Sequence, residues 1–234
     1  MEDSKKTIRL GGAQAADEER LYLRDATFTL PTGERVEVTR SNVAGMDMGD
    51  IFARHQGRYY QVGLFCRPGQ RVLDFPCGSG YASEVLAPFN LRYEGLDIDL
   101  STVAYAKAVY GNNATTYAYG DLKNPQVEVG AYDVIGCIEG LEHIEMEHQD
   151  NLIATLSAGL KPGGVLVVSS PENLSGKSGQ GPDNKWHVGE LTKEDFVKLL
   201  ERHFPVNKVE LVTHSAVLST GKLTNCFYGI CHKG

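Results

Sequence analysis

Three carboxylates between residues 74 and 121 each stand at the end of a short apolar run that is typical of a buried strand. Asp74 precedes the glycine turn Gly78-Ser79-Gly80, Asp97 closes the next apolar run, and Asp121 follows the third. In an open parallel sheet, such strand ends lie along one edge, where ligands bind. A shared site explains this pattern better than three separate loop acids or helix caps do.

The chemistry of these residues favours a nucleoside that carries an amino acid. A Gly-x-Gly turn lets the backbone approach a ligand without Cβ clashes, and Asp74 beside it suits an ammonium group better than a phosphate. Asp97 follows the turn by about 20 residues, where an acid can chelate a ribose diol. Asp121 can accept a hydrogen bond from an adenine amino group.

The glycine turn also distinguishes between NAD and S-adenosylmethionine as the expected cofactor. A dinucleotide fingerprint requires a third glycine beside the pyrophosphate, but Tyr81-Ala82-Ser83 follows the turn here. The sequence therefore predicts S-adenosylmethionine rather than NAD, and it disfavours a nicotinamide oxidoreductase. A purely structural turn is the alternative interpretation of the glycines alone.

A Glu-x-x-Glu-His cluster, Glu139, Glu142 and His143, comes just after the fourth apolar run. Groups three to four residues apart on a helical turn share one face, so they could ligate a hard divalent ion such as Mg²⁺. Without a metal, His143 or His187 could act as general base on an acceptor hydroxyl, because neutral imidazole suits this role near pH 7. The alternative for His143 is a packing or helix-start role.

Trp186 and His187 follow a loop rich in glycine, which is able to move. Trp186 offers a flat apolar face for a sugar or aromatic ring, and His187 offers a polar group beside it. We expect both residues to line an acceptor pocket rather than the core.

Alternating strand-like and helix-like segments must position these residues. The expected strands are residues 71–75, 93–97, 115–119, 132–138 and 165–169, with late candidates at about 206–218 and 225–232. The expected helices are residues 50–65, 81–87, 101–110 with Ser101 as its cap, 151–160, and one capped by Thr192. This order predicts a doubly wound, Rossmann-like α/β sheet, mostly parallel with an antiparallel C-terminal strand.

The chain divides into three expected parts. Residues 1–20 are polar and are expected to form a flexible tail. Residues 21–69 combine a β-hairpin around a Pro/Gly turn with a helix that covers the cofactor, and residues 70–234 form the S-adenosylmethionine-binding domain.

Composition narrows the class of protein. The net charge of −7 disfavours general nucleic-acid binding, because an acidic surface repels phosphate backbones. The five cysteines form no C-x-x-C pair, which favours reduced thiols over disulfides or a zinc site. No signal peptide or membrane-spanning run is visible, so we expect a cytoplasmic protein.

From residue 50 to residue 204 the chain resembles the class I S-adenosylmethionine-dependent methyltransferases. The motifs that carry the resemblance are VLDFPCGSGYAS, GLDID, YGDL, YDVIGCIEGLEHI, LKPGGVLVVSSPEN and WHVGELTKEDFVKLLERHF. It is most similar to bacterial enzymes often associated with glycan and lipopolysaccharide biosynthesis. Those enzymes share a His-x-x-Arg-Tyr element, here ending at Tyr59, and an Asn-x-aromatic-His-x-x-Glu element, here starting at Asn184.

The resemblance implies a role for each site residue. Asp74 and the two glycines would hold the methionine part, and Asp97 would hold the ribose. Asp121 and Leu122 would flank the adenine, and Tyr59 would close over the cofactor. The implied cofactor-binding set is Tyr59, Asp74, Gly78, Gly80, Asp97, Ile98, Asp121, Leu122 and Glu139.

Two groups of methyltransferases use a cluster similar to Glu-x-x-Glu-His to bind a metal: ubiquinone-pathway O-methyltransferases and small-RNA 3′-end methyltransferases. In the second group a further histidine precedes a Thr-capped helix, and His187 matches that place. The implied metal set is Glu139, Glu142, His143 and His187, while Glu139, His143 and His187 are the catalytic candidates.

Three functions are compatible with these patterns. The favoured one is methyl transfer from S-adenosylmethionine to a small-molecule acceptor, such as a hydroxyl of a sugar, glycan precursor or secondary metabolite. The first alternative is Mg-dependent 2′-O-methylation of RNA ends, against which the acidic charge and the lack of a basic or aromatic RNA-binding segment count. The second alternative is a non-catalytic S-adenosylmethionine-binding regulatory protein.

Overall fold

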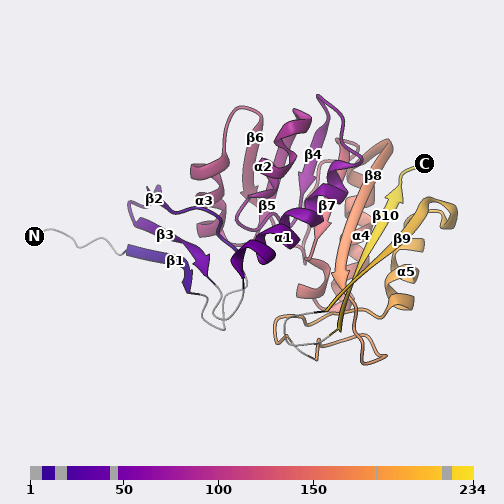
Figure 1. Cartoon of the computed structure of the whole chain (residues 1–234). Helices are drawn as coiled ribbons and strands as arrows, with labels where there is room; N and C mark the ends of the chain where they lie inside the picture. The colour runs from indigo at the N-terminus through magenta and orange to yellow at the C-terminus, as the bar shows by residue number, and fades with distance from the viewer. Residues whose placement is uncertain (1–6, 14–19, 43–46, 183, 218–222) are drawn as a thin grey trace, which may run out of the picture.

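A seven-stranded sheet with the strand order β6-β5-β4-β7-β8-β10-β9 forms the centre of the molecule (Figure 1). The computed structural model describes residues 7–13, 20–42, 47–182, 184–217 and 223–234. The strands of this sheet are β4 (Arg71–Asp74), β5 (Arg92–Asp97), β6 (Thr115–Tyr119), β7 (Tyr132–Ile138), β8 (Leu160–Pro171), β9 (Val209–Val217) and β10 (Leu223–His232). Neighbouring strands from β6 to β8 are parallel, and β10 is antiparallel to β8 and β9. The predicted sheet, with its antiparallel C-terminal strand, is confirmed.

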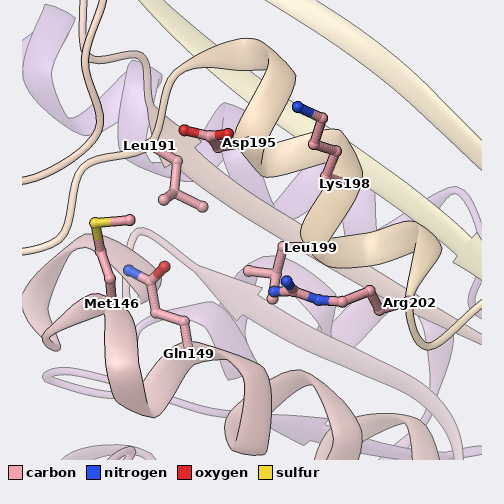
Figure 2. Close-up of a pocket in the computed structure, with 7 residues that line it drawn as sticks. All are labelled: Met146, Gln149, Leu191, Asp195, Lys198, Leu199 and Arg202. Atoms are coloured by element: carbon pink, nitrogen blue, oxygen red, sulfur yellow. The ribbon is translucent and has the colours of Figure 1, made fainter.

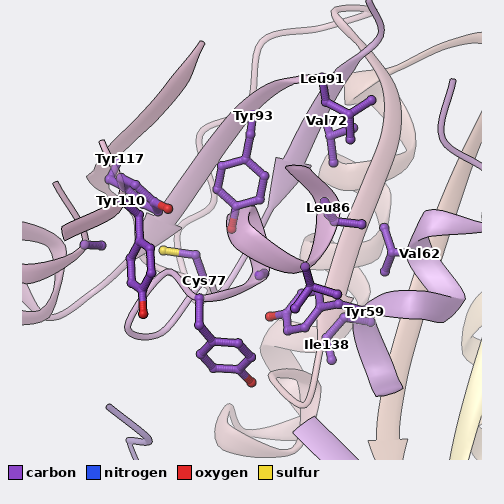
Figure 3. Packing of buried hydrophobic residues seen from close by; sticks show 14 of the residues in the cluster. Tyr59, Val62, Val72, Cys77, Leu86, Leu91, Tyr93, Tyr110, Tyr117 and Ile138 are labelled. Carbon is purple, nitrogen blue, oxygen red and sulfur yellow. The ribbon is translucent and has the colours of Figure 1, made fainter. Parts of the chain in front are cut away.

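Helices cover both faces of this sheet. They are α1 (Met48–Gly63), α2 (Ala82–Leu86), α3 (Leu100–Tyr110), α4 (Met146–Gly159) and α5 (Lys193–Glu201), with short 3₁₀ helices η1 (Ala87–Phe89), η2 (Leu141–His143) and η3 (Val206–Lys208). Because successive strand residues point to opposite faces, Val72 packs in one buried cluster with α1, α2 and α3, and Leu73 packs in another with α4 and α5. Figure 3 shows part of the first cluster, including Tyr59, Val62 and Leu86.

The strand order reverses beside β4. Asp74, at the end of β4, pairs with Gly95 of β5 on one side and with Gly136 of β7 on the other. In open α/β sheets, ligands bind outside the carboxyl ends of the strands at such a switch point. The fold therefore places the residues that follow β4, β5 and β7 along one edge.

A second sheet, with the order β1-β3-β2, lies in the N-terminal part of the chain (Figure 1). Its strands are β1 (Thr7–Ala13), β2 (Ala26–Thr29) and β3 (Arg35–Asn42). β2 and β3 form the predicted hairpin, but β1 lies within the segment that was expected to be a flexible tail. Its alternate residues Ile8 and Leu10 pack against the first buried cluster, a pattern that the surrounding polar residues concealed. Residues 1–6 and 14–19, also assigned to that tail, lie outside the described residues.

Local capping signals located one helix start and misplaced another. Thr192 caps α5 as predicted, and its side chain accepts a hydrogen bond from Asp195 N. The cap of α3 is Asp99 rather than Ser101, because the Asp99 carboxylate accepts hydrogen bonds from the backbone amides of Ser101 and Thr102. Throughout the part of the chain that the structure describes, no helix has both the length and the apolar character needed to cross a membrane.

Candidate active site

Asp97, at the end of β5, lies in a hydrogen-bond network beside the glycine turn. Its Oδ2 accepts a hydrogen bond from Gly78 N (3.0 Å). Its Oδ1 accepts hydrogen bonds from Asp99 N (3.0 Å) and from Arg20 Nη2 (2.9 Å). The carboxylate is buried, so it is fixed at the strand end where the resemblance places a ribose-binding acid.

The two glycines of the turn are required for different reasons. Gly78 has a φ of 51°, and no described atom beyond its chain neighbours comes within 4 Å of the place of a Cβ. At Gly80, where φ is 86°, a Cβ would stand 2.7 Å from Ala106 Cβ and 2.8 Å from Tyr117 Cε1. Gly78 thus faces open space, as the close approach of a ligand requires, whereas Gly80 allows packing against α3 and β6.

Asp74 is buried at the end of β4 and is held by two tyrosines. Tyr93 Oη (2.5 Å) and Tyr59 Oη (3.2 Å) donate hydrogen bonds to its carboxylate. Burial raises the pKa of Asp74 to about 7, although both hydrogen bonds oppose the rise and the charge of Asp97 adds to it. Tyr59, expected to close over the cofactor, is itself buried and links α1 to this acid. A cationic group near Asp74 would offset the cost of burying its charge.

Asp121 and Leu122, the residues expected around an adenine, lie beyond the end of β6, and Ile98, expected in the cofactor-binding set, follows β5. The Asp121 carboxylate accepts hydrogen bonds from Lys123 N (2.8 Å) and Asn124 Nδ2 (3.2 Å), so Asp121 has a structural role in an Asx turn. Leu122 is buried, whereas Ile98, directly after β5, is 54% exposed. An exposed apolar side chain at this place could cover one face of a flat base.

Glu139 follows β7 with a left-handed backbone conformation, its φ being 49°. Arg58 Nη2 lies 3.0 Å from Glu139 Oε2, and Ser169 Oγ (2.7 Å) and Cys226 Sγ (3.2 Å) donate to Oε1. Burial acts to raise the pKa of Glu139, but the charge of Arg58 and these two hydrogen bonds outweigh it and lower the pKa. Glu139 is therefore an ionised carboxylate that joins α1, β8 and β10.

Glu142, His143 and His187 come together from η2 and from the loop before α5. Their potential ligand atoms lie within 4.8 Å of one another, and the two imidazole rings meet edge to face with centroids 5.0 Å apart. Burial and the charge of Glu139 raise the pKa of Glu142 well above its usual range. Among the described residues, Glu142 Oε2 has no hydrogen-bond partner. Three of the four expected metal ligands are thus grouped, and Glu139 lies outside the group because its carboxylate is paired with Arg58.

Buried contacts hold this loop against η2. His187 Nδ1 lies 2.6 Å from Oε1 of the buried Glu190. Gln149 Nε2 of α4 donates hydrogen bonds to Leu141 O (3.0 Å) and Gly189 O (2.7 Å). Gln149 also lines a cavity of 200 Å³ between α4 and α5 (Figure 2), which none of the expected site residues lines. The role of α4 is therefore to support η2 and the loop.

Trp186 projects outward from the same loop. Trp186 is 44% exposed, and Lys185 Nζ lies 5.0 Å from the centroid of its indole ring. The Trp186 carbonyl oxygen lies 3.3 Å from His143 Nδ1. An exposed indole, on a residue whose backbone carbonyl lies near His143, fits an acceptor-pocket wall better than a core position.

Several partners of the expected acids come from distant segments and were missed by sequence reasoning. Arg58 lies within the His-x-x-Arg-Tyr element, so that motif was the available signal for it. The contacts of Arg20, Ser169 and Cys226 have no comparable signal, because each depends on which segments the fold brings together.

Comparison with known proteins identifies the family. A family model described as a methyltransferase domain matches residues 51–217. A probable S-adenosylmethionine-dependent methyltransferase of Mycolicibacterium smegmatis is 31% identical over 170 residues, which cover 72% of this chain and 64% of that protein. A ubiquinone biosynthesis O-methyltransferase of Burkholderia thailandensis is 31% identical over 106 residues, covering 44% of this chain and 45% of that protein. The chain thus matches less than two thirds of the length of these two relatives.

Solved structures with this fold include proteins of different chemistry. Phosphoethanolamine N-methyltransferase 2 of Haemonchus contortus, in complex with phosphomonomethylethanolamine and S-adenosylhomocysteine, has a TM-score of 0.62 at 14% identity, over 77% of this chain and 52% of that chain. The [4+2]-cyclase SpnF has a TM-score of 0.60 at 15% identity, over 76% of this chain and 80% of that chain. At these identities the likeness shows the fold alone.

The family match and the position of the expected cofactor residues at the switch point beside β4 both indicate a methyltransferase domain. The chain belongs to the class I S-adenosylmethionine-dependent methyltransferases, as its motifs predicted. We call Asp74, Gly78, Asp97 and Ile98, which are expected to bind the cofactor, the cofactor edge. We call Glu139, Glu142, His143, Trp186 and His187, which include the expected catalytic, metal and acceptor residues, the acceptor edge; Glu139 was also expected among the cofactor-binding residues.

Proposed function

We propose that the protein transfers a methyl group from S-adenosylmethionine to a hydroxyl group of a small molecule, with sugars, glycan precursors and secondary metabolites as acceptor classes. The observation that carries this proposal is the pair of imidazoles, His143 and His187, with the backbone carbonyl of the exposed Trp186 next to His143. Imidazoles can accept a hydroxyl proton, and an indole can cover a ring. The relative named as a ubiquinone biosynthesis O-methyltransferase supports an oxygen acceptor.

At the cofactor edge, the residues of the chain bind and orient the methyl donor. Asp97 would accept hydrogen bonds from ribose hydroxyls, and Asp74 would stabilise the ammonium group across the open turn at Gly78. Bound S-adenosylmethionine supplies a methyl group on a positively charged sulfur. Orientation is the main requirement, because methyl transfer needs the nucleophile, methyl carbon and sulfur in line.

At the acceptor edge, His143 or His187 takes the proton of the acceptor hydroxyl while the new O–C bond forms and the C–S bond breaks. The sulfur loses its positive charge and the imidazole gains one with the proton, so the total charge is unchanged and no covalent intermediate is required. Trp186 and its loop lie beside these imidazoles, where a loop can cover the acceptor and exclude water.

The group of Glu142, His143 and His187 also fits a divalent cation. A cation would satisfy the buried Glu142 Oε2, which has no partner in the described part of the chain. One carboxylate with two imidazoles suits Fe²⁺ or Zn²⁺ better than Mg²⁺, which prefers oxygen ligands. The chemistry that such a cation would supply is a lower pKa for a coordinated hydroxyl.

A screen of acceptors tests the proposed reaction. We expect transfer of labelled methyl to a sugar, nucleotide sugar or phenol, with one S-adenosylhomocysteine formed for each methyl ether. Methylation of short RNA alone would support the 2′-O-methyltransferase instead. Binding of S-adenosylhomocysteine without transfer to any acceptor would support a non-catalytic protein.

Removal of metal tests the cation separately. After exhaustive chelation we expect activity to fall and to return with one of Mg²⁺, Mn²⁺, Fe²⁺ or Zn²⁺. Calorimetry should detect binding of that ion to the wild-type protein and weaker binding to Glu142→Gln. Full activity after chelation, with no ion bound, would leave the imidazoles as bases alone.

A further inference from the structure

Residues 20–24, which we call the strap, pass over the glycine turn before the hairpin begins. Leu21 and Tyr22 are buried, and the Leu21 carbonyl accepts a hydrogen bond from Ser79 Oγ (2.5 Å). Tyr22 Oη lies 2.9 Å from Thr102 Oγ1 of α3, and Tyr22 N donates to Ser41 Oγ (2.9 Å). These contacts fix the strap against the cofactor edge and set the position of the residue at its start, Arg20.

The Arg20 guanidinium lies between two acids. Its Nη2 is 2.9 Å from Asp97 Oδ1, and its Nη1 is 3.6 Å from Asp99 Oδ2. The Asp97 side chain is only 4% exposed, whereas the Asp99 side chain is 36% exposed. Arg20 therefore contacts the one carboxylate that the methyl donor needs for its ribose, and a second, more exposed carboxylate beside it.

Arg20 and a bound ribose would compete for the same acceptor positions of the Asp97 carboxylate. A carboxylate offers about four acceptor positions. Three donors already occupy Asp97: Arg20 Nη2 and Asp99 N on Oδ1, and Gly78 N on Oδ2. A ribose diol brings two more donors. The amides of Gly78 and Asp99 belong to the turn and to the cap of α3, so Arg20 is the donor that can leave at least cost.

We propose that Arg20 is an internal competitor of the cofactor ribose for Asp97, an inference that rests on the proposed binding of S-adenosylmethionine at this edge. Asp99 gives the displaced guanidinium a partner, because Asp99 Oδ1 caps α3 while Oδ2 lies towards Arg20. Only molecules in which Arg20 has left Asp97 can bind the ribose. The apparent affinity for the cofactor is therefore the intrinsic affinity multiplied by the fraction of such molecules. Displacement of Arg20 also couples cofactor binding to the position of the strap.

Titration calorimetry with S-adenosylhomocysteine on the full chain tests this competition. We expect Arg20→Ala to bind at least about fivefold more tightly than the wild type, because the competing state is removed. Arg20→Lys keeps the charge but loses the planar guanidinium that reaches both acids, so its affinity should lie between those of the wild type and Arg20→Ala. Arg24→Ala is the matched control. Arg24 lies on the same strap and pairs with Glu84, away from Asp97, so its affinity should equal that of the wild type.

Unchanged or weaker binding by Arg20→Ala would overturn the competition, and weaker binding would place Arg20 in the wall of the cofactor site. Thermal unfolding of each variant without ligand checks that the strap still packs. The proposed function fails in a different way: neither the wild type nor Arg20→Ala would bind S-adenosylhomocysteine, although both are folded. That outcome would remove the inference as well. Binding by Arg20→Ala alone would support both.

Discussion

The cofactor edge and the acceptor edge differ in how far along the chain their contacts reach. Asp97 is bonded by the glycine turn before it and by the amide two residues after it. Glu139 instead depends on Arg58 and on Cys226, which is 87 residues away. Arg20 also reaches Asp97, from 77 residues away, so the first edge combines strand ends and local turns with one distant contact, whereas the second edge is held mainly by tertiary packing. We therefore expect substitutions at the cofactor edge to change affinity or stability, and substitutions at the acceptor edge to change turnover.

Asp74→Asn should give the largest change, in the pH dependence of stability. In the wild type, the pKa of Asp74 is about 7 in the folded protein against an ordinary value of 3.8. Between these values the unfolded chain has lost a proton that the folded chain keeps, so the free energy of unfolding falls as pH rises from about 4 to about 7, by at most about 4 kcal/mol. Above the folded pKa this contribution is constant.

Denaturant unfolding without cofactor, at several pH values across this window, measures the effect. Asp74→Asn should show a smaller fall than the wild type, and Asp121→Asn, which changes a turn carboxylate, serves as the control. Equal falls in the wild type and Asp74→Asn would show that the charge of Asp74 is not destabilising at the cofactor edge.

His187→Ala should lower turnover about 100-fold, a loss of about 2.7 kcal/mol, because a proton acceptor or ligand is removed. Its affinity for S-adenosylhomocysteine should stay within about twofold of the wild type. Glu190→Gln keeps a hydrogen-bonding group beside His187 Nδ1 and should have a smaller effect. Turnover and affinity are measured on the same preparations, and parallel losses in both would merge the two edges into one site.

Asp97→Ala should weaken S-adenosylmethionine binding by about 10- to 100-fold, or about 1.5–3 kcal/mol, because the charged acceptor that we propose for the ribose is lost. Asp97→Asn can still accept the hydrogen bond from Gly78 N and should retain part of the affinity. Calorimetry compares the three proteins. Unchanged affinity in Asp97→Ala would assign this acid to the turn alone.

Trp186→Ala should have the smallest effect, lowering turnover of the true acceptor about tenfold, or about 1.4 kcal/mol. The indole belongs to a residue that is exposed beside Lys185, and we expect it to cover the acceptor. Trp186→Phe keeps an aromatic face and should recover part of the activity. Loss of cofactor affinity in Trp186→Ala, instead of turnover, would place the loop at the cofactor edge.

The sheet and the position of two acids at its strand ends could be predicted because their signals are short-range. Apolar runs, helix periodicity and the glycine turn located the parallel strands, and Asp74 and Asp97 stand at strand ends as expected. The capping residue of α3 was misplaced by two positions, since Asp99 and Ser101 are both good caps and only the backbone path chooses between them. β1 was missed because its two apolar residues find their contacts on a distant cluster.

The sequence by itself determined which residues stand at the strand ends, because a strand and its turn are encoded by neighbouring residues. Only the tertiary structure decided what those residues contact. A buried carboxylate needs a cation or hydrogen-bond donors, and these can come from any segment that the fold brings near. Glu139 pairs with Arg58, and this contact separates Glu139 from Glu142 and the two histidines. Asp97 pairs with Arg20, which lies on a segment that was expected to be a tail.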